Sequence, residues 1–423
     1  MCRSRKSTDA IQPTSSNSKR RSFSSSFQTP KSLKPSSSFS DPSPSTTSTT
    51  NDLASSSSNF FFNSSSYYLS TQTSNTLSSL RASLPENPHI YDFSLISSAT
   101  TNFLSKRFSS SSSSSSSWLC HLHGKQVVVF RRKLRRSIEL DDLVHKLSVV
   151  CRSHHSSLIK LLGASLYGDF VYLVYEYVKG ANLGDCLRNP KNPSFTPLSS
   201  WISRMQIAID IAHGLDYIHH CSGLETSFTH NHIKATSILV AEDSLTAKIC
   251  HFGTAEICGE VSKEEGSRSL GRTDSKVMKI EGTRGYMAPE LQFNGLVTQK
   301  CDVYAFGVVV LELLSGEEAL KFMFDEGDGG YKRVSVIDTA REAAAAGSGG
   351  VRRWVDRRLK DSFPVEVAEK MVLVALECLE EDPERRPEMK KVVGKVSKLY
   401  LESKNWADNI GLPTDISVSM APR

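Results

Sequence analysis

The pattern of hydrophobic and polar positions divides the chain into a polar start and a longer part with regular apolar segments. Apolar runs at 127–130 and 171–178 are rich in β-branched and aromatic residues, which is typical of buried strands. Apolar positions recur every three or four residues between 201 and 220, which predicts a helix with one buried face, and residues 140–150 also favour a helix. A Gly/Ala-rich stretch at 325–350, with a short helical candidate at 334–346, is interpreted as a surface insertion.

Residues 1–85 are dominated by Ser, Thr, Asn and Pro and offer little apolar surface to bury, so we expect a disordered Ser-rich tail. The tail carries nine Lys or Arg against three Asp, a balance that equals the +6 of the whole chain. The rest of the chain is therefore neutral overall, which argues against a nucleic-acid partner. Ser22, Thr29 and Ser43 are candidate phosphorylation sites in the tail.

The localisation that the sequence favours is cytoplasmic. The longest apolar stretch, 303–314, is too short to span a bilayer, and no signal-peptide core follows the N-terminus. Nine scattered cysteines without zinc-site spacing fit reduced thiols in the cytosol. S-acylation of Cys2, beside Arg3 and Arg5, would give peripheral contact with the inner face of the plasma membrane. The same Ser-rich, acid-poor start also fits an organellar transit peptide, and composition does not separate these alternatives.

Three short segments carry the candidate chemistry. Residues 230–234 read His-Asn-His-Ile-Lys, residues 251–253 read His-Phe-Gly, and residues 282–290 end in Ala-Pro-Glu. In their order they resemble the His-Arg-Asp, Asp-Phe-Gly and Ala-Pro-Glu signatures of protein kinases. The segments at 282–290 and 301–316 are most similar to plant receptor-like kinases, including those with LysM ectodomains. The whole resembles a receptor-like cytoplasmic kinase in a degenerate, pseudokinase form.

This resemblance implies the domain organisation. It predicts an α+β, bilobal protein-kinase-like fold at 86–403, with a β-rich N-lobe at 90–178 and a helical C-lobe at 179–403. The disordered tail at 1–85 precedes this domain, and a C-terminal tail at 404–423 follows it. Residues 93–103 resemble the short helix that leads into the N-lobe of receptor-like kinases.

Five positions that carry the family's catalytic charges and metal ligands hold other residues here. Phe130 stands at the phosphate-binding lysine of the N-lobe strand, and Lys146 at the glutamate that pairs with it. His232 replaces the aspartate that accepts the substrate proton, while Ser237 and His251 replace the two magnesium ligands. The family's glycine-rich phosphate loop corresponds to residues 109–117, which contain no glycine. We therefore expect no catalytic, cofactor-binding or metal-binding residue.

The resemblance implies a catalytically impaired kinase homologue that acts as a scaffold or allosteric partner of an active receptor-like kinase. The alternative is an unconventional Ser/Thr protein kinase with weak residual ATP binding, in which Arg132 or Lys146 reaches a phosphate. A third reading places His230, His232 and His251 around a transition metal.

The resemblance also implies several structural contacts in the C-lobe. Arg386 is expected to pair with Glu290, and Asp302 to brace the backbone near His230. Lys234 is expected to face solvent or a nearby carboxylate. Tyr175 stands at the family's gatekeeper position.

Overall fold

The structure, a computed structural model, describes residues 88–108, 116–188, 191–221, 228–260, 282–325 and 329–410. All of them belong to one compact unit, Gln72–Arg423. The predicted Ser-rich tail, Cys2 and most of the glycine-free segment at 109–117 lie outside the described residues.

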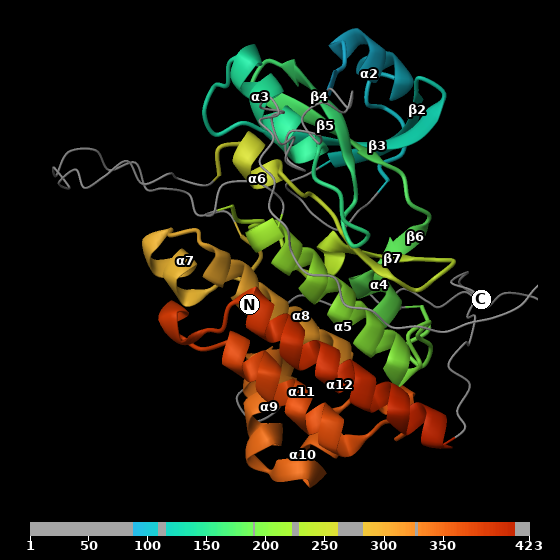
Figure 1. Cartoon of the computed structure of the whole chain (residues 1–423), viewed down its shortest axis with the longest axis vertical. Helices are drawn as coiled ribbons and strands as arrows, with labels where there is room; N and C mark the ends of the chain where they lie inside the picture. The colour runs from blue at the N-terminus through green and yellow to red at the C-terminus, as the bar shows by residue number, and fades with distance from the viewer. Residues whose placement is uncertain are drawn as a thin grey trace, which may run out of the picture. The chain divides into compact units, whose positions relative to one another are not determined.

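A five-stranded sheet forms the first half of the described chain, with strand order β1-β4-β5-β3-β2 (Figure 1). Both predicted strands are confirmed, and they pair antiparallel at the centre of the sheet, where buried Val129 lies opposite buried Val174. A two-residue turn at His123 and Gly124, with φ of 49° and 73°, connects two of the strands. The strands are β1 His89–Ile90, β2 Ser116–Leu122, β3 Lys125–Lys133, β4 Leu161–Tyr167 and β5 Phe170–Glu176.

Two helices pack against this sheet. The helix α2, Phe93–Ala99, buries Ile96 in a small apolar cluster with strand residues, in agreement with the predicted leading helix. The helix α3, Leu140–Cys151, confirms the helix predicted at 140–150 and turns Leu143, Leu147 and Val150 into the core. This second helix carries Lys146, so its position decides what that ammonium contacts.

The second half of the described chain is mainly helical (Figure 1). Its central helix, α8, is buried on nearly every side, as expected for a helix that is apolar all round. The predicted helix at 201–220 is present as α5, followed by a π-helical turn at Tyr217–Cys221, and it packs against the last helix, α12. The main helices are α4 Leu183–Leu187, α5 Trp201–Asp216, α6 Thr254–Ile257, α7 Pro289–Asn294, α8 Gln299–Ser315, α11 Val365–Cys378 and α12 Met389–Ile410.

Short strands and 3-10 turns complete this half. A three-stranded sheet joins β6 Gly180–Asn182, β7 Ile238–Ala241 and β8 Ala247–Ile249, and its strands β7 and β8 lie between the two histidine-containing segments in the chain. The 3-10 turns are Ala235–Ser237, Arg357–Leu359 and Pro383–Arg385. The last helix continues to Ile410, past residue 403, where the sequence places the domain end. No helix in the described ranges is long and apolar enough to cross a membrane.

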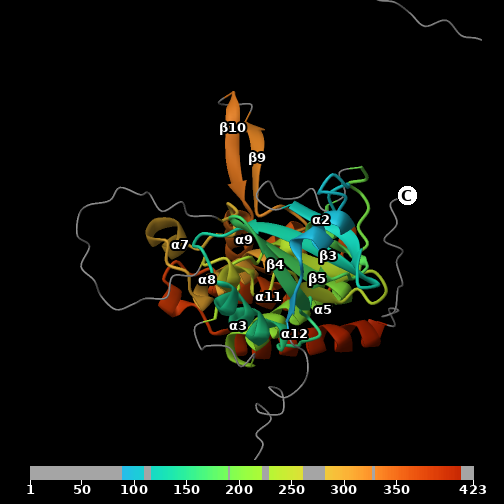
Figure 2. The same ribbon diagram turned by 90° about the horizontal axis from the view of Figure 1, so that it is seen from above.

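The short helix predicted at 334–346 is confirmed as α9, Val336–Ala345, but the interpretation of the whole stretch 325–350 as a surface insertion was wrong for this helix. A β-hairpin of β9 Leu320–Asp325 and β10 Gly330–Ser335 projects away from the helices (Figure 2). The helices α9 Val336–Ala345 and α10 Gly347–Trp354 follow it. Val336 and Ala340 of α9 are buried against α8 and α11, so this segment belongs to the core.

Candidate functional site

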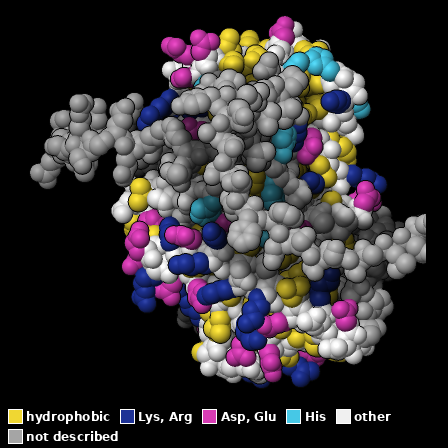
Figure 3. Space-filling view, viewed as in Figure 1, with side chains coloured by type: hydrophobic (Ala, Val, Ile, Leu, Met, Phe, Trp, Pro, Cys, Tyr) yellow, Lys and Arg dark blue, Asp and Glu magenta, His cyan; other side chains and the backbone are white. Residues whose placement is uncertain are grey.

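The structure brings the two histidine-containing segments together between the sheet and the helices. The His230 and His232 rings lie 6.3 Å apart, and the His232 and His251 rings are also separated by 6.3 Å. Figure 3 shows histidine side chains at this level of the molecule. The place where a kinase holds magnesium and phosphate is therefore lined by imidazoles.

Phe130 closes the upper side of this site with an aromatic contact. From strand β3 its ring meets the His251 ring edge to face, with centroids 4.6 Å apart. Burial lowers the pKa of His251 well below its ordinary value, and the nearby positive charge of Arg132 lowers it further. His251 is therefore neutral, and its buried Nδ1 has no hydrogen-bond partner among the described residues. An aromatic ring over a neutral imidazole is a packing contact and offers nothing to a phosphate.

Lys146 is held by the segment that follows residues 251–253. Its ammonium donates a hydrogen bond to the carbonyl oxygen of Glu256 at 3.0 Å and lies 3.4 Å from the Glu256 carboxylate. Glu256 lies in the short helix α6, which packs directly against α3 (Figure 1). The charge reversal at position 146 thus has an acidic counterpart in α6.

His232 is also matched by an acidic residue. Its Nε2 lies 2.9 Å from Oε2 of Glu260, whose side chain is almost fully buried. Burial raises the pKa of Glu260, but His232, Arg132 and Arg135 outweigh this and lower it to about 2. Glu260 is therefore ionised at neutral pH and faces several cationic or basic neighbours.

Ser237 is hydrogen-bonded to the residue that precedes His251. Its backbone carbonyl accepts a hydrogen bond from Cys250 N at 2.9 Å, and its buried hydroxyl has no partner among the described residues. A neutral hydroxyl and a neutral imidazole therefore stand where the family has two magnesium ligands. Since magnesium prefers carboxylate and other oxygen ligands, this pair fits the metal poorly.

Asp302 braces the first histidine segment, as the resemblance implied. Its carboxylate accepts hydrogen bonds from the backbone N–H groups of His230 at 2.7 Å and Asn231 at 2.8 Å. His219 Nε2 lies 3.0 Å from the same carboxylate. The His230 ring is itself fixed by the Cys250 carbonyl at 2.9 Å, and burial lowers the pKa of His230 to about 4. These contacts hold the loop in place.

The predicted pair of Glu290 and Arg386 is confirmed. The guanidinium donates two hydrogen bonds to the carboxylate, at 2.6 and 2.8 Å, and is completely buried. Lys234 is partly exposed, which is consistent with the expected contact with solvent, and its ammonium donates a hydrogen bond to the Thr283 hydroxyl at 3.1 Å. The gatekeeper-position Tyr175 is buried and donates its hydroxyl to the Phe252 carbonyl at 2.9 Å, which ties the sheet to residues 251–253.

The described residues contain no group of three His, Cys, Asp or Glu side chains placed to hold a metal ion. His230 is engaged with a carbonyl and His232 with Glu260, so the three histidines do not converge on one point. The structure therefore gives the transition-metal hypothesis no support.

Glu256 and Glu260 are the site residues that sequence reasoning missed. Both follow Gly253 within seven residues, in a segment with no motif of its own. The available signal was the pair of cationic or basic replacements at positions 146 and 232, because a buried cation needs a counter-charge. The sequence alone did not indicate where that counter-charge would come from.

Comparison with known proteins assigns this arrangement to a family. A family model described as protein tyrosine and serine/threonine kinase matches residues 121–396. The LysM domain receptor-like kinase 3 of Arabidopsis thaliana is 33% identical over 328 residues, which cover 76% of this chain and 48% of the relative. The chitin elicitor receptor kinase 1 of the same plant is 33% identical over 294 residues, which cover 68% of this chain and 43% of the relative. The chain thus spans about half the length of the curated relatives it matches.

One solved structure with the same fold is the pseudokinase domain of BIR2, described as an immune regulator of the RLK/Pelle family. The TM-score is 0.57 at 23% sequence identity, and the match covers 78% of this chain and 96% of that one. At this level of identity the likeness concerns the fold alone.

Proposed function

Because this chain belongs to the protein tyrosine and serine/threonine kinase family, we propose that it is a kinase homologue that signals by binding and not by phosphoryl transfer. The observation that carries the proposal is the paired loss and replacement of charge in the cleft. Lys146 and His232 stand where two carboxylates act in the family, and each is matched by an acid from the segment after residues 251–253. In such a site the charges of the protein stabilise one another, and they are not arranged to bind a nucleotide and its metal.

Phosphoryl transfer depends on positioning and on charge stabilisation, so each missing group affects the same transition state. Phe130 offers no charge to the phosphates, and Ser237 and the neutral His251 hold magnesium poorly. These losses do not extend to the fold, because the buried Glu290–Arg386 pair and the Asp302 brace are kept. Only the charged residues with structural roles are retained, and this supports a function in which the surface of the domain binds a partner.

The partner class that we propose is an active receptor-like kinase, which this chain would scaffold or regulate allosterically. The support is the similarity to the LysM domain receptor-like kinase 3 and to the chitin elicitor receptor kinase 1, whose names describe a receptor-like kinase and a receptor kinase. We propose a cytoplasmic location, with a lipidated Cys2 as the route to the inner face of the plasma membrane. ATP is not required in this proposal.

A second candidate function rests on the His232–Glu260 contact. The Glu260 carboxylate, 2.9 Å from Nε2 of His232, would stabilise the imidazolium that forms when His232 accepts the proton of a substrate hydroxyl as general base. This observation favours an unconventional Ser/Thr kinase with weak ATP binding, in which Arg132 contacts phosphate.

One experiment separates the two candidates. The purified full-length chain is incubated with radiolabelled ATP and magnesium or manganese, alone and with a generic protein substrate, beside the His232→Ala variant. The binding role predicts that labelling of the wild type does not exceed that of the variant. If the wild type is labelled and the His232→Ala variant is not, the binding role is overturned and the chain is an active phosphotransferase. Co-purification with a panel of receptor kinase domains then tests the partner class, and failure with all of them would contradict the scaffold role.

A further inference from the structure

A concentration of basic side chains covers the last turn of helix α10 and the residues after it, and α10 lies at the end of the helical part away from the sheet (Figure 1). Within nine residues, 352–360, the chain carries four arginines and a lysine. Two hollows of about 1030 and 430 Å³ adjoin this segment and share part of their lining. The shared lining is Arg353, Val355, Asp356 and Arg357.

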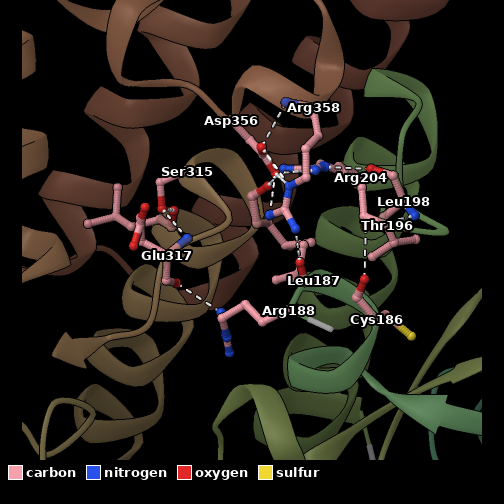
Figure 4. A network of polar contacts seen from close by, with 12 residues as sticks. Cys186, Leu187, Arg188, Thr196, Leu198, Arg204, Ser315, Glu317, Asp356 and Arg358 are labelled. Atoms are coloured by element: carbon pink, nitrogen blue, oxygen red, sulfur yellow. Dashed lines mark hydrogen bonds and ion pairs between the residues drawn. The ribbon is translucent and has the colours of Figure 1, made fainter. Parts of the chain in front are cut away.

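Part of this positive charge is neutralised internally. Asp356 is buried and forms ion pairs with Arg204 at 2.6 Å and with Arg358 at 2.7 Å (Figure 4). Arg352 lies 3.3 Å from the Asp361 carboxylate. Both aspartates that line the smaller hollow are therefore already engaged by other arginines.

The remaining cations of this segment have no counter-charge among the residues that the structure describes. Arg353, Arg357 and Lys360 are exposed, all three line the smaller hollow, and none forms an ion pair with a described residue. Three uncompensated cations around one hollow are suited to a group with two negative charges and several acceptor oxygens. A phosphate monoester has these properties, whereas a single carboxylate would leave part of the charge unmatched.

The larger hollow has a different character. The half-buried Trp354 and the buried Val336 contribute apolar lining. Two further cations of this hollow are engaged by carboxylates, Arg188 by Glu312 at 2.9 Å and Lys321 by Glu317 at 2.7 Å. The carboxylates of Asp185 and Glu318 also line the hollow and form no ion pair with a described residue. Those carboxylates would repel an extended polyanion such as a nucleic acid, and a flat membrane surface does not enter a hollow of this kind. The ligand that matches both hollows has one phosphate beside apolar and basic residues.

We propose that this surface binds a phosphorylated serine or threonine in a segment of a partner protein. The phosphate would lie on Arg353, Arg357 and Lys360, and the neighbouring apolar and basic residues of the partner would occupy the larger hollow. The site lies outside the cleft between the lobes and uses none of its residues. The inference therefore goes beyond the proposed function and would hold equally for an active kinase.

The test uses fluorescence anisotropy of a labelled heptapeptide, Lys-Leu-Gly-phosphoserine-Gly-Leu-Lys, titrated with the full-length protein. The unphosphorylated peptide serves as the ligand control. The site variant is Arg353→Gln/Arg357→Gln/Lys360→Gln. The matched control variant is Lys390→Gln/Lys391→Gln/Lys398→Gln, which removes the same charge from exposed positions of α12.

The expected result is binding of the phosphopeptide that weakens at least ~10-fold in the site variant, because charge-assisted hydrogen bonds to the phosphate are lost. The α12 variant should bind as the wild type does, and its circular dichroism and that of the site variant should match the wild type. Equal binding of both peptides, equal weakening in both variants, or no binding by the wild type at ~1 mM protein would overturn the proposal. A site variant that lost only its binding to phosphatidylserine vesicles would also overturn it, in favour of a lipid surface.

Discussion

Lys146 of helix α3 donates a hydrogen bond to the Glu256 carbonyl, and its ammonium lies 3.4 Å from the Glu256 carboxylate. In an active kinase the residue at position 146 is an acid that pairs with a lysine of the neighbouring strand. Here the polarity is reversed, and the partner comes from the segment after residues 251–253. The contact fastens α3 to that segment and so stabilises one arrangement of the cleft.

Reversing the charge at Lys146 should loosen this contact. The Lys146→Glu variant places a carboxylate opposite Glu256, and since both side chains are partly exposed we expect a loss of about 1 kcal/mol in the free energy of unfolding. The double variant Lys146→Glu/Glu256→Lys restores opposite charges and should recover part of it. Urea denaturation of the wild type, of the single variants Lys146→Glu and Glu256→Lys, and of the double variant measures the coupling energy between the two side chains. A coupling energy of zero would show that the contact does not stabilise the cleft.

The Glu290–Arg386 pair should be much more sensitive, because its guanidinium is completely buried. The Glu290→Gln variant leaves that charge without a counter-ion, and we expect a loss of about 3–5 kcal/mol in the free energy of unfolding. Glu317→Gln removes one partner of the exposed Lys321 pair and should cost no more than about 1 kcal/mol. If chemical denaturation gave equal losses for the two variants, the structural role assigned to Glu290 would be wrong.

Sequence reasoning was most successful where a local pattern and a buried surface coincide. The strands around Val129 and Val174 were predicted because β-branched runs mark a fully buried sheet centre. The Glu290–Arg386 pair was predicted only through the family resemblance, since its partners are far apart in the chain. The hairpin at 320–335 was not predicted, because exposed Phe322 and Phe324 leave no alternation of buried and exposed positions.

The site was predicted as a set of losses but not as a set of contacts. Phe130, Lys146, His232, Ser237 and His251 were assigned by their positions relative to the three motifs. Their new partners depend on where the segment after Gly253 folds back, and no local pattern determines that. The roles of Glu256 and Glu260 follow from the packing of the segment around α6 against α3, which the sequence does not indicate.

The Glu260–His232 contact should make stability depend on pH. The pKa of Glu260 is lowered from 4.5 to about 2, mainly by His232 acting against burial. A lowered pKa stabilises the folded state fully above the unfolded value of 4.5, and this contribution is lost as the pH falls toward 2. The stability difference between the wild type and Glu260→Gln should therefore shrink as the pH is lowered from 4.5.

Urea titrations at several pH values between neutrality and the acid limit of folding measure this difference. Glu242→Gln, which removes a partner of the exposed Lys179, provides the control for a surface ion pair. If the free energy of unfolding of the wild type increasingly exceeded that of Glu260→Gln as the pH fell, Glu260 would not be the ionised partner.

Whether the cleft binds ATP and magnesium together can be measured through the melting temperature of the full-length chain. It is measured with ATP alone, with ATP and magnesium, and with ATP and manganese. A ligand that binds only the folded state at ~100 times its dissociation constant stabilises it by about 2.7 kcal/mol, which would appear as a shift of several degrees. The account predicts no metal-dependent shift at ~1 mM ATP. A shift of several degrees that requires magnesium or manganese would contradict it.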